Sequence, residues 1–336
     1  MHHLVYPASE KRSADRRRWF FAYGPLSVAK SLTRLPGKPY LGQADRLTER
    51  QIMTEELGNH AKAGDSPREQ KLDILKAILA DMGSVLVAYS GGTDSTLLLK
   101  AAHDELAEKA LAVTAVSPSL STEELEDARH MAERIGAPHV TIDSDEMENP
   151  DYRANSPQRC YYCKHTLFDE LLKLARERSL AHVLDGCNVD DLGDHRPGIE
   201  AARELGVRSP LVEAGLSKED IRVLSRKMGL PTWNKPSAAC LASRIPYGTA
   251  ITEERLKQIE GAERFVRGLG ISQVRVRLHG EIGRIEVDPA SIHLLLEHRT
   301  EIVHELRSLG FKYVTIDLEG YRTGSMNEVL GPANHG

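Results

Sequence analysis

The sequence predicts an α/β protein, in which a doubly wound parallel sheet is followed by a smaller α+β domain. Short, valine-rich apolar runs alternate with segments of helical periodicity up to about residue 248, which is typical of a parallel sheet covered by helices on both faces. Beyond that point the order changes to a helix, two strands, a helix and a strand. The glycine pair Gly91-Gly92, between the first strand and the next helix, indicates a ligand-binding turn.

The elements of the sheet follow from periodicity in chain order. Apolar residues at helical spacing run from Glu69 to Met82, directly before the first apolar run. Ser121 and Glu124 have the spacing of a capping box, which marks the start of a helix. We expect strands from 85 to the turn at Ser90, and at 110–116, 139–142 and 181–186. Helices are expected at 69–82, from Ser95-Thr96 to about 108, at 122–135 and 164–178, and after the cap Ser217-Asp220.

The C-terminal part is predicted to be a small α+β unit. We expect helices at 252–269 and 289–309, and strands at 272–278, 283–287 and 311–317. Units of this kind often carry contacts between subunits, so a homo-oligomer is expected. The predicted organisation is an N-terminal extension (1–60), the sheet domain (61–248) and the C-terminal α+β domain (249–330).

The first 60 residues show no sustained period and mix basic residues with proline and glycine, so we predict a weakly ordered extension. Its basic run Arg16–Arg18 precedes a short apolar segment and is superficially similar to an export signal. Gly24 and Pro25 end the apolar part too early for that interpretation. An over-long start, with Met53 as the true first residue, is the other interpretation.

Composition excludes several classes of protein. The chain has 336 residues, is 40% hydrophobic, and contains no apolar run near the ~18 residues that a membrane span needs. Its net charge of −5 divides into +6 for residues 1–52 and −11 for the rest, which argues against nucleic acid as the main partner. Four cysteines are too few for a secreted disulfide scaffold, so we expect metal-binding or reactive thiols in a reducing compartment.

The turn Ser90-Gly91-Gly92-Thr93-Asp94-Ser95 is predicted to hold phosphate. The glycines allow close backbone approach, and the first N–H groups of the following helix have no partner within the helix. The spacing differs from a Walker A loop, and no lysine follows the second glycine. An ordinary strand-to-helix turn is the alternative. Ser-Gly-Gly-x-Asp-Ser resembles the PP-loop of ATP pyrophosphatases, which implies that Ser90, Gly91, Gly92, Thr93 and Ser95 hold pyrophosphate while Asp94 serves Mg²⁺ or the loop geometry.

Three cysteines form the second candidate site. We predict that Cys160 and Cys163 lie in an irregular segment before the helix at 164–178, and Cys240 follows 77 positions after Cys163. Three thiolates can ligate three irons of a [4Fe–4S] cluster and leave the fourth iron open. Zn²⁺ with His165 as a fourth ligand, or three buried inert cysteines, are the alternatives. Cys187 is expected to be a small core residue.

Two further groups lie where ligands bind in such sheets. Ser117, at the end of the second strand, is a candidate for contact with adenine. Asp190, Asp191 and Arg196 follow the strand at 181–186, where they form either a helix cap or a site for Mg²⁺ and substrate. Their position at the carboxyl end of the strand favours the site.

Four motifs together resemble the LarE family of ATP-dependent sulfur transferases over about residues 69–328. They are the phosphate turn, Arg159–Lys164, Asp185–Asp191 with Arg196-Pro197-Gly198, and Lys235–Arg244. The resemblance implies that a carboxylate of pyridinium-3,5-biscarboxylic acid mononucleotide is adenylated with ATP and Mg²⁺ and converted to a thiocarboxylate, for the nickel-pincer cofactor of lactate racemase. An enzyme of this kind is expected to be cytoplasmic.

The resemblance also implies roles for single residues. Cys240 matches the cysteine that some members sacrifice as the sulfur source, whereas the set Cys160, Cys163 and Cys240 resembles the members that hold a [4Fe–4S] cluster and need a sulfur donor to reload it. Ser243 and Arg244 are then candidates to hold nucleotide or substrate near the sulfur. Residues that resemble the family's active-site carboxylate and phosphate-binding arginines are Glu263 (or its neighbour Glu260), Arg275 and Arg277.

Chemistry assigns one more residue. Adenylation of a carboxylate develops charge on the departing pyrophosphate, which Mg²⁺, the loop amides and Lys164 would offset before a sulfur nucleophile attacks the activated carbonyl. Alternatively, Lys164 is only the first exposed residue of a helix, and Arg275 and Arg277 lie on a solvated strand face. A PP-loop tRNA thiolase and a non-catalytic ATP-binding module are the rival functions.

Overall fold

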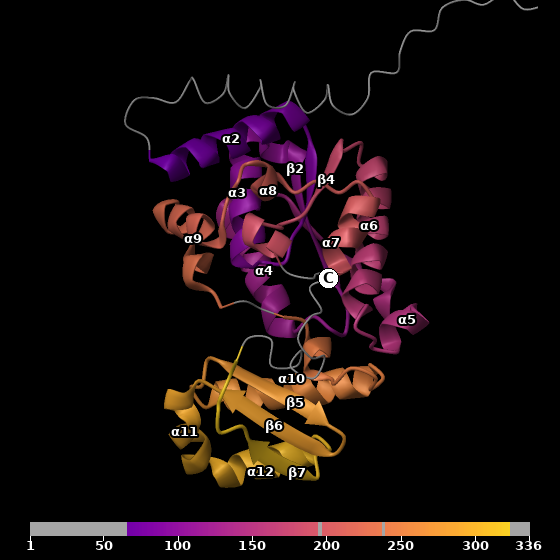
Figure 1. The fold of residues 1–336 in the computed structure, drawn as a ribbon, viewed down its shortest axis with the longest axis vertical. Coiled ribbons are helices and arrows are strands. Elements are labelled where there is room, and N and C mark those ends of the chain that lie inside the picture. Colours follow the sequence, from indigo (N-terminus) through magenta and orange to yellow (C-terminus); the bar gives the residue numbers. More distant parts are fainter. Residues whose placement is uncertain (1–65, 194–196, 237–238, 323–336) are drawn as a thin grey trace, which may run out of the picture. The chain divides into compact units, whose positions relative to one another are not determined.

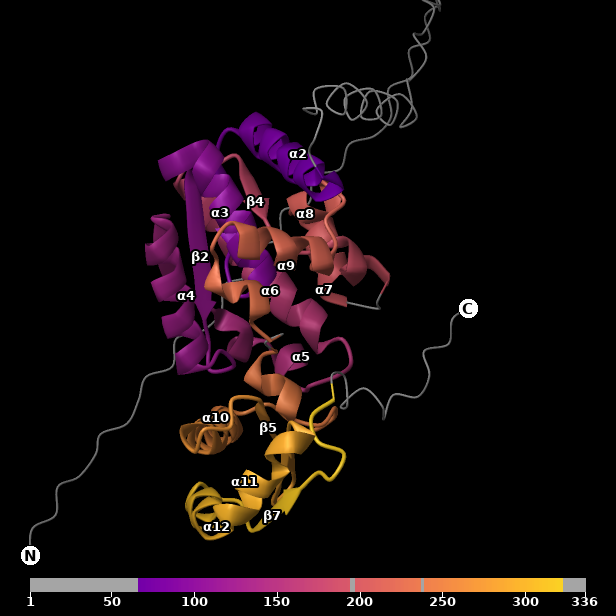
Figure 2. The same cartoon turned by 90° about the vertical axis from the view of Figure 1, so that its left-hand side faces the viewer.

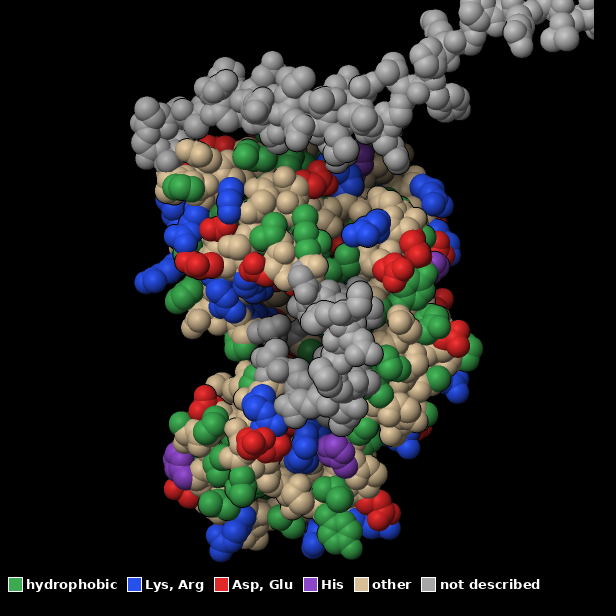
Figure 3. Space-filling view, in the orientation of Figure 1, with side chains coloured by type: hydrophobic (Ala, Val, Ile, Leu, Met, Phe, Trp, Pro, Cys, Tyr) green, Lys and Arg blue, Asp and Glu red, His purple; other side chains and the backbone are tan. Residues whose placement is uncertain are grey.

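A computed structural model describes residues 66–193, 197–236 and 239–322. The predicted extension 1–60 and the candidate Arg196 lie outside these ranges. In the described part of the chain, no helix has the length and apolar character needed to cross a membrane. Figure 3 shows acidic and basic side chains interspersed over one face of the molecule.

The centre of the N-terminal part is a four-stranded parallel sheet in the order β3-β2-β1-β4, which confirms the predicted doubly wound fold. Val85 in β1 pairs with Ala110 in β2 and with His182 in β4, so the carboxyl ends of these strands lie at the same edge of the sheet. The strands are β1 (Val85–Ala88), β2 (Ala110–Val116), β3 (His139–Asp143) and β4 (His182–Leu184).

Helices cover both faces of this sheet because alternate strand residues point to opposite faces. In β1, Val85 and Val87 pack into one core with α2 (Pro67–Met82), α3 (Thr93–Leu106), α4 (Thr122–Ile135) and α9 (Lys218–Lys227). Leu86 packs into the other core with α6 (Arg159–Glu177) and α7 (Pro197–Glu204). Figures 1 and 2 show these helices on the two sides of the sheet; the short helices α5 (Pro150–Arg153) and α8 (Pro210–Glu213) complete this part.

The C-terminal part contains the predicted second sheet, with strand order β5-β6-β7. Its elements are α10 (Glu253–Gly268), β5 (Val274–His279), β6 (Ile282–Val287), α11 (Ile292–Glu297), α12 (Arg299–Ser308) and β7 (Tyr313–Ile316). One prediction here is wrong, since the helix expected at 289–309 is divided at His298. Leu295 and Ile302 both reach the core and are seven residues apart, a spacing that an unbroken helix would also give.

The predicted irregular segment around Cys160 and Cys163 is also wrong. Helix α6 begins at Arg159, two residues after Pro157, so both cysteines lie in its first turns. At a spacing of three residues they occupy the same face of the helix. A proline just upstream of a helix is a start signal that the periodicity of the later residues does not reveal.

Asp220 joins α9 to α2. Its carboxylate accepts hydrogen bonds from Lys71 Nζ at 2.6 Å and Arg68 Nε at 3.0 Å, and it completes the predicted capping box with Ser217. Burial alone would raise its pKa, but the hydrogen bonds from Lys71, Ser217 and Arg68 lower the pKa of Asp220 below its usual value. The folded state therefore favours the ionised carboxylate.

We expect Asp220→Asn to lower the free energy of unfolding by about 1–2 kcal/mol at pH 7, because a cap and two charge-assisted hydrogen bonds are weakened. The folded pKa lies below the unfolded value of about 3.9, so this stabilisation is present above that pH and is lost as the pH falls. Denaturant titrations at pH 7 and pH 3 measure the change. The difference between the proteins should shrink at pH 3, while the exposed-site control Asp73→Asn should cost less than about 0.5 kcal/mol at both.

Candidate active site

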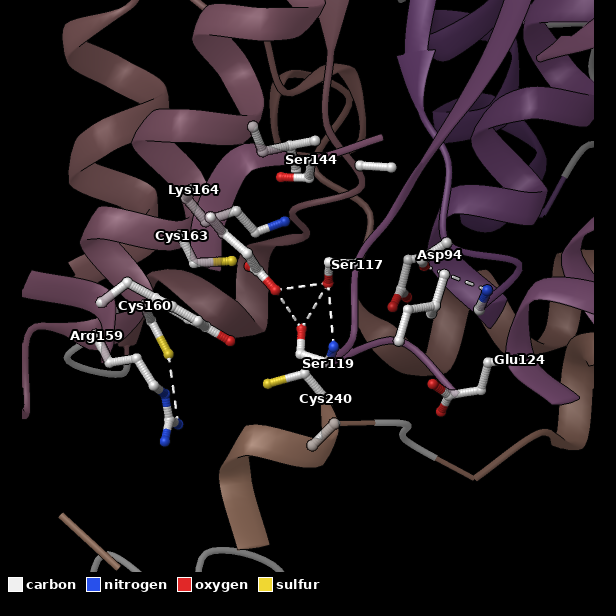
Figure 4. Close-up of a pocket in the computed structure, with 18 of the residues that line it drawn as sticks. Asp94, Ser117, Ser119, Glu124, Ser144, Arg159, Cys160, Cys163, Lys164 and Cys240 are labelled. Atoms are coloured by element: carbon white, nitrogen blue, oxygen red, sulfur yellow. Dashed lines mark hydrogen bonds between the residues drawn. The ribbon is translucent and has the colours of Figure 1, made fainter. Parts of the chain in front are cut away.

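One pocket of about 430 Å³ lies at the carboxyl edge of the parallel sheet (Figure 4). The turn after β1 lines it, together with the end of β2, the segment after β3, the first turns of α6 and a segment that ends at Cys240. The lining residues predicted from the sequence are Ser90, Gly92, Thr93, Asp94, Ser117, Cys160, Cys163, Lys164 and Cys240. The structure thus brings the phosphate turn and the three cysteines to one cavity.

Hydroxyl groups hold the phosphate turn. Ser95 Oγ lies 3.1 Å from Ser90 Oγ and accepts from the Ser90 N–H at 3.3 Å, while Thr93 Oγ1 donates to the carbonyl of Thr232 at 2.8 Å. Ser95 is buried behind the turn and is not among the described lining residues. Its role in this structure is to shape the turn.

Gly91 shows why this turn needs glycine. Its φ of +67° lies in the left-handed region, and an added Cβ would come within 2.8 Å of the Cα of Ala128 in α4. Neither the strand nor α4 could move away without disturbing the core. Gly91 thus allows the turn to pack against α4, whereas Gly92 faces the pocket.

Asp94 offers a place for Mg²⁺. One carboxylate oxygen pairs with Lys218, and the other, Oδ1, is buried without a hydrogen-bond partner in the described structure. A buried, unpaired carboxylate oxygen beside a phosphate turn is a suitable ligand for a hard divalent cation. The residues present therefore fit a bound Mg²⁺, with Asp94 as its protein ligand.

Three lysines add positive charge to the pocket wall. Lys164 lies in the second turn of α6 with its ammonium 5.4 Å from the Phe168 ring centroid. Lys218 pairs with Asp94, and Lys235 donates to Asp127 at 2.8 Å and to the Gly91 carbonyl at 3.4 Å. Lys164 was predicted, but Lys218 and Lys235 were not, although Lys235 opens one of the quoted motifs.

Cys160, Cys163 and Cys240 line the pocket from two chain segments. In Figure 4 the Cys160 side chain points toward Arg159, whose Nη2 lies 4.0 Å from its sulfur. No group of three His, Cys, Asp or Glu side chains in the described ranges converges closely enough to hold a single metal ion. A four-iron cluster is wider than one ion and takes one thiolate per iron, so three thiols spread around a cavity fit it as a donor set.

Burial controls the two inner thiols. It raises the pKa of Cys163 well above the usual value, with a further increase from the Glu146 carboxylate. Burial also raises the pKa of Cys240, although the nearby Arg159 guanidinium partly offsets this. Both thiols are therefore protonated at neutral pH until a ligand or a reactant replaces the proton.

A polar clamp, formed by Asn155 and Arg159, connects the two cysteine-bearing segments. Asn155 Nδ2 donates to the carbonyls of Ile245, Pro246 and Thr249 at 2.9–3.2 Å. Arg159 Nη1 donates to Asn155 Oδ1 at 2.8 Å and to the carbonyl of Ala242 at 3.0 Å. The start of α6 and the turn after Cys240 are thus joined by direct hydrogen bonds.

Arg244 and Glu263 form a buried ion pair beneath the Cys240 turn. Arg244 Nε and Nη2 lie 2.9 and 3.1 Å from the two carboxylate oxygens, and Nη1 donates to the Cys240 carbonyl at 3.0 Å and to Ser243 Oγ at 2.9 Å. Burial alone would raise the pKa of Glu263, but Arg244 holds it below the usual value. In this structure Ser243, Arg244 and Glu263 support the turn, and none of these three is among the described lining residues.

Arg275 and Arg277 lie on β5 but do not face solvent, so the interpretation of a solvated strand face is wrong. Arg277 pairs with Glu286 at 2.9 Å and donates to the Ser243 carbonyl at 3.1 Å. Arg275 donates to the carbonyl of Val274, and its guanidinium lies over the ring of Tyr321. Neither lines the pocket in the described structure, so their role in binding phosphate stays a prediction.

The acidic loop after β4 is engaged in backbone hydrogen bonds. Asp190 Oδ2 accepts from the N–H of Lys218 at 2.8 Å, at the start of α9, and Asp191 Oδ2 accepts from the N–H of Asn188 at 3.1 Å. Neither aspartate is among the described lining residues. The contacts match the helix-cap alternative, and through Lys218 they position the cation that pairs with Asp94.

The structure adds lining residues that sequence reasoning missed: Glu124, Glu146, Tyr152, Arg159, Lys218 and Lys235. Glu146 is 3% exposed and follows the carboxyl end of β3, next to the predicted ligand edge of the sheet. The position of a strand end was therefore a usable signal for it. Tyr152 and Arg159 had no such signal, because both lie between the predicted strand at 139–142 and the predicted helix at 164–178.

Comparison with known proteins supports one family. No family model matches the chain. It is 48% identical to an uncharacterized protein of Synechocystis sp. over 78% of the chain and 98% of that protein. It is 41% identical to pyridinium-3,5-bisthiocarboxylic acid mononucleotide synthase of Lactiplantibacillus plantarum, over 77% of the chain and 94% of the enzyme.

The chain is more distantly similar to the tRNA-specific 2-thiouridylase MnmA of a Caulobacter species. The two are 27% identical over 51% of this chain and 52% of that enzyme. This relative supports the PP-loop superfamily, whereas the synthase matches over nearly its whole length. The chain therefore belongs to the LarE family of ATP-dependent sulfur transferases.

Proposed function

We propose that this enzyme adenylates a carboxylate of pyridinium-3,5-biscarboxylic acid mononucleotide with ATP and replaces the AMP by sulfur, in biosynthesis of the nickel-pincer cofactor. The proposal is supported by the synthase relative and by one observation above all: the phosphate turn and three thiols line the same pocket. A nucleotide-binding module without catalysis has no use for that combination.

The first step needs a phosphate cradle and a cation. A carboxylate oxygen of the substrate attacks the α-phosphorus of ATP, the bond to the bridging oxygen breaks, and pyrophosphate leaves. In this proposal the charge that develops on the pyrophosphate is offset by the N–H groups at the start of α3, by Mg²⁺ held by Asp94, and by the pocket lysines Lys164, Lys218 and Lys235. The product is an acyl-adenylate, whose carbonyl has AMP as its leaving group.

The second step needs sulfur. A sulfur nucleophile attacks the activated carbonyl carbon, a carbon–sulfur bond forms, and the carbon–oxygen bond to AMP breaks. Cys160, Cys163 and Cys240 are the proposed ligands of a [4Fe–4S] cluster, which when bound would leave one iron without a protein ligand to supply the sulfur. The chain's own contribution is to hold these three thiols at the pocket wall.

The test is substrate-dependent release of pyrophosphate. The full chain with ATP and Mg²⁺ should release pyrophosphate at least about 100-fold faster when pyridinium-3,5-biscarboxylic acid mononucleotide is present, because only a bound carboxylate accepts the adenylyl group. Parallel reactions with bulk tRNA test the thiolase alternative. Release that depends on tRNA, or on no acceptor at all, would contradict the proposal.

A further inference from the structure

Glu146 is a buried acid in the wall of the active-site pocket. It lies in the turn after β3, is 3% exposed, and lines the cavity together with Tyr152 and Cys163. Its Oε1 accepts hydrogen bonds from Ser117 Oγ at 2.6 Å and from Ser119 Oγ at 2.5 Å. The two serines follow the carboxyl end of β2, so Glu146 lies beside the predicted nucleotide edge of the sheet.

The hydrogen-bond partners of Glu146 are neutral. No lysine or arginine of the described residues forms an ion pair with it, whereas two other buried carboxylates have such a partner, as Glu263 has Arg244 and Glu286 has Arg277. Lys164 lines the same pocket, but its ammonium lies over the ring of Phe168. Burying a carboxylate without a positively charged partner costs free energy, so this position favours a ligand that itself carries a positive charge.

Glu146 also lies close to the sulfur chemistry. Its charge acts on the thiols of Cys163 and Cys240, and on Tyr152, whose buried hydroxyl has no hydrogen-bond partner among the described residues. A ligand that reaches this wall thus meets a negative charge and an unused polar group beside the thiols. The reacting carboxyl group must approach the sulfur that these thiols hold or supply in the same pocket, so the ring that carries it must lie near Glu146.

We propose that Glu146 binds the positively charged pyridinium ring of the substrate and makes the site specific for a ring that carries this charge. The inference rests on the proposed function and assigns the residue that recognises its substrate class. The carboxylate supplies a negative partner for a ring with a permanent positive charge, on a part of the pocket wall where no lysine or arginine of the described residues pairs with it, and the two serine hydroxyls fix its orientation. A neutral ring of the same shape gains nothing from it.

The experiment compares two ligands that differ in ring charge. Pyridinium-3,5-biscarboxylic acid mononucleotide and its 1,4-dihydropyridine reduction product, whose ring is uncharged, carry the same carboxylates, ribose and phosphate. Calorimetric titration of the full chain should show the cationic form binding at least about tenfold more tightly. Glu146→Gln keeps the shape and an acceptor, and should reduce this preference to about twofold or less while the affinity for the neutral form and for ATP stays within about twofold.

Glu148→Gln is the matched control, because it removes a carboxylate from the same turn at an exposed position and should retain the tenfold preference. Unchanged ATP affinity shows that Glu146→Gln is folded. A preference that survives in Glu146→Gln, or an equal loss for both mononucleotides or for ATP, would overturn the role of Glu146 alone. If the wild type binds neither mononucleotide, the proposed function fails as well.

Discussion

Replacing Cys240 by serine is expected to abolish thiocarboxylate formation, by at least about 10³-fold, while adenylation of the mononucleotide stays within about threefold of the wild type. A hydroxyl neither ligates iron well nor serves as a sulfur source, whereas the phosphate turn and Asp94 belong to other elements. Mass spectrometry of the product, beside an assay of pyrophosphate, measures the two steps separately.

Cys187→Ser is the matched control, because Cys187 is not among the described lining residues and should leave both steps intact. Iron and acid-labile sulfide, measured anaerobically, separate the two sources of sulfur. Four irons per chain that are lost in Cys240→Ser support the cluster, whereas an iron-free wild type that converts Cys240 to dehydroalanine supports a sacrificed cysteine. Full sulfur transfer by Cys240→Ser would contradict both.

Asp94→Asn is expected to lower the rate of pyrophosphate release by about 10²–10³-fold and to raise the Mg²⁺ concentration needed for half-maximal rate. The amide keeps the size of the side chain but loses the charge that its buried, unpaired Oδ1 presents to a cation. Initial rates of pyrophosphate release across a Mg²⁺ titration measure both effects.

The control is Asp104→Asn on the same helix, whose carboxylate pairs with Lys100 outside the pocket. It removes one charge and one ion pair from α3, and should leave the Mg²⁺ dependence unchanged. If Asp94→Asn shows the Mg²⁺ dependence of the wild type, Asp94 shapes the loop through Lys218 and does not serve the metal.

The sequence predicted the sheet well because its signals are local. Strand β2 begins and ends where the apolar run does, and the caps Ser121 and Ser217 mark helix starts that the structure confirms. The phosphate turn was predictable for the same reason, because residues 90–95 are contiguous. Apolar periodicity failed at two places where the apolar pattern does not change. At His298 one helix ends and the next begins, and at Arg159 a helix begins.

The rest of the site depends on contacts between distant segments. Lys218 and Asp94 are 124 positions apart, and nothing in the sequence around either residue indicates the partner. Arg275 and Arg277 show the same limit. The alternation of apolar and polar residues placed both side chains on one face of a strand, but it could not reveal that Arg277 donates hydrogen bonds to Glu286 and to the Ser243 carbonyl. Identifying Glu146 required the cavity itself, because one glutamate among many carries no pattern.

Because of the polar clamp of Asn155 and Arg159, sulfur transfer and adenylation depend on the integrity of two different hydrophobic cores. The clamp and the Cys240 turn pack with the core that contains Leu241, Ala242 and the C-terminal helices, whereas the phosphate turn belongs to the core of the parallel sheet. Local loosening of the former core would therefore uncouple the two steps. A protein damaged there would continue to consume ATP without delivering a sulfurated product.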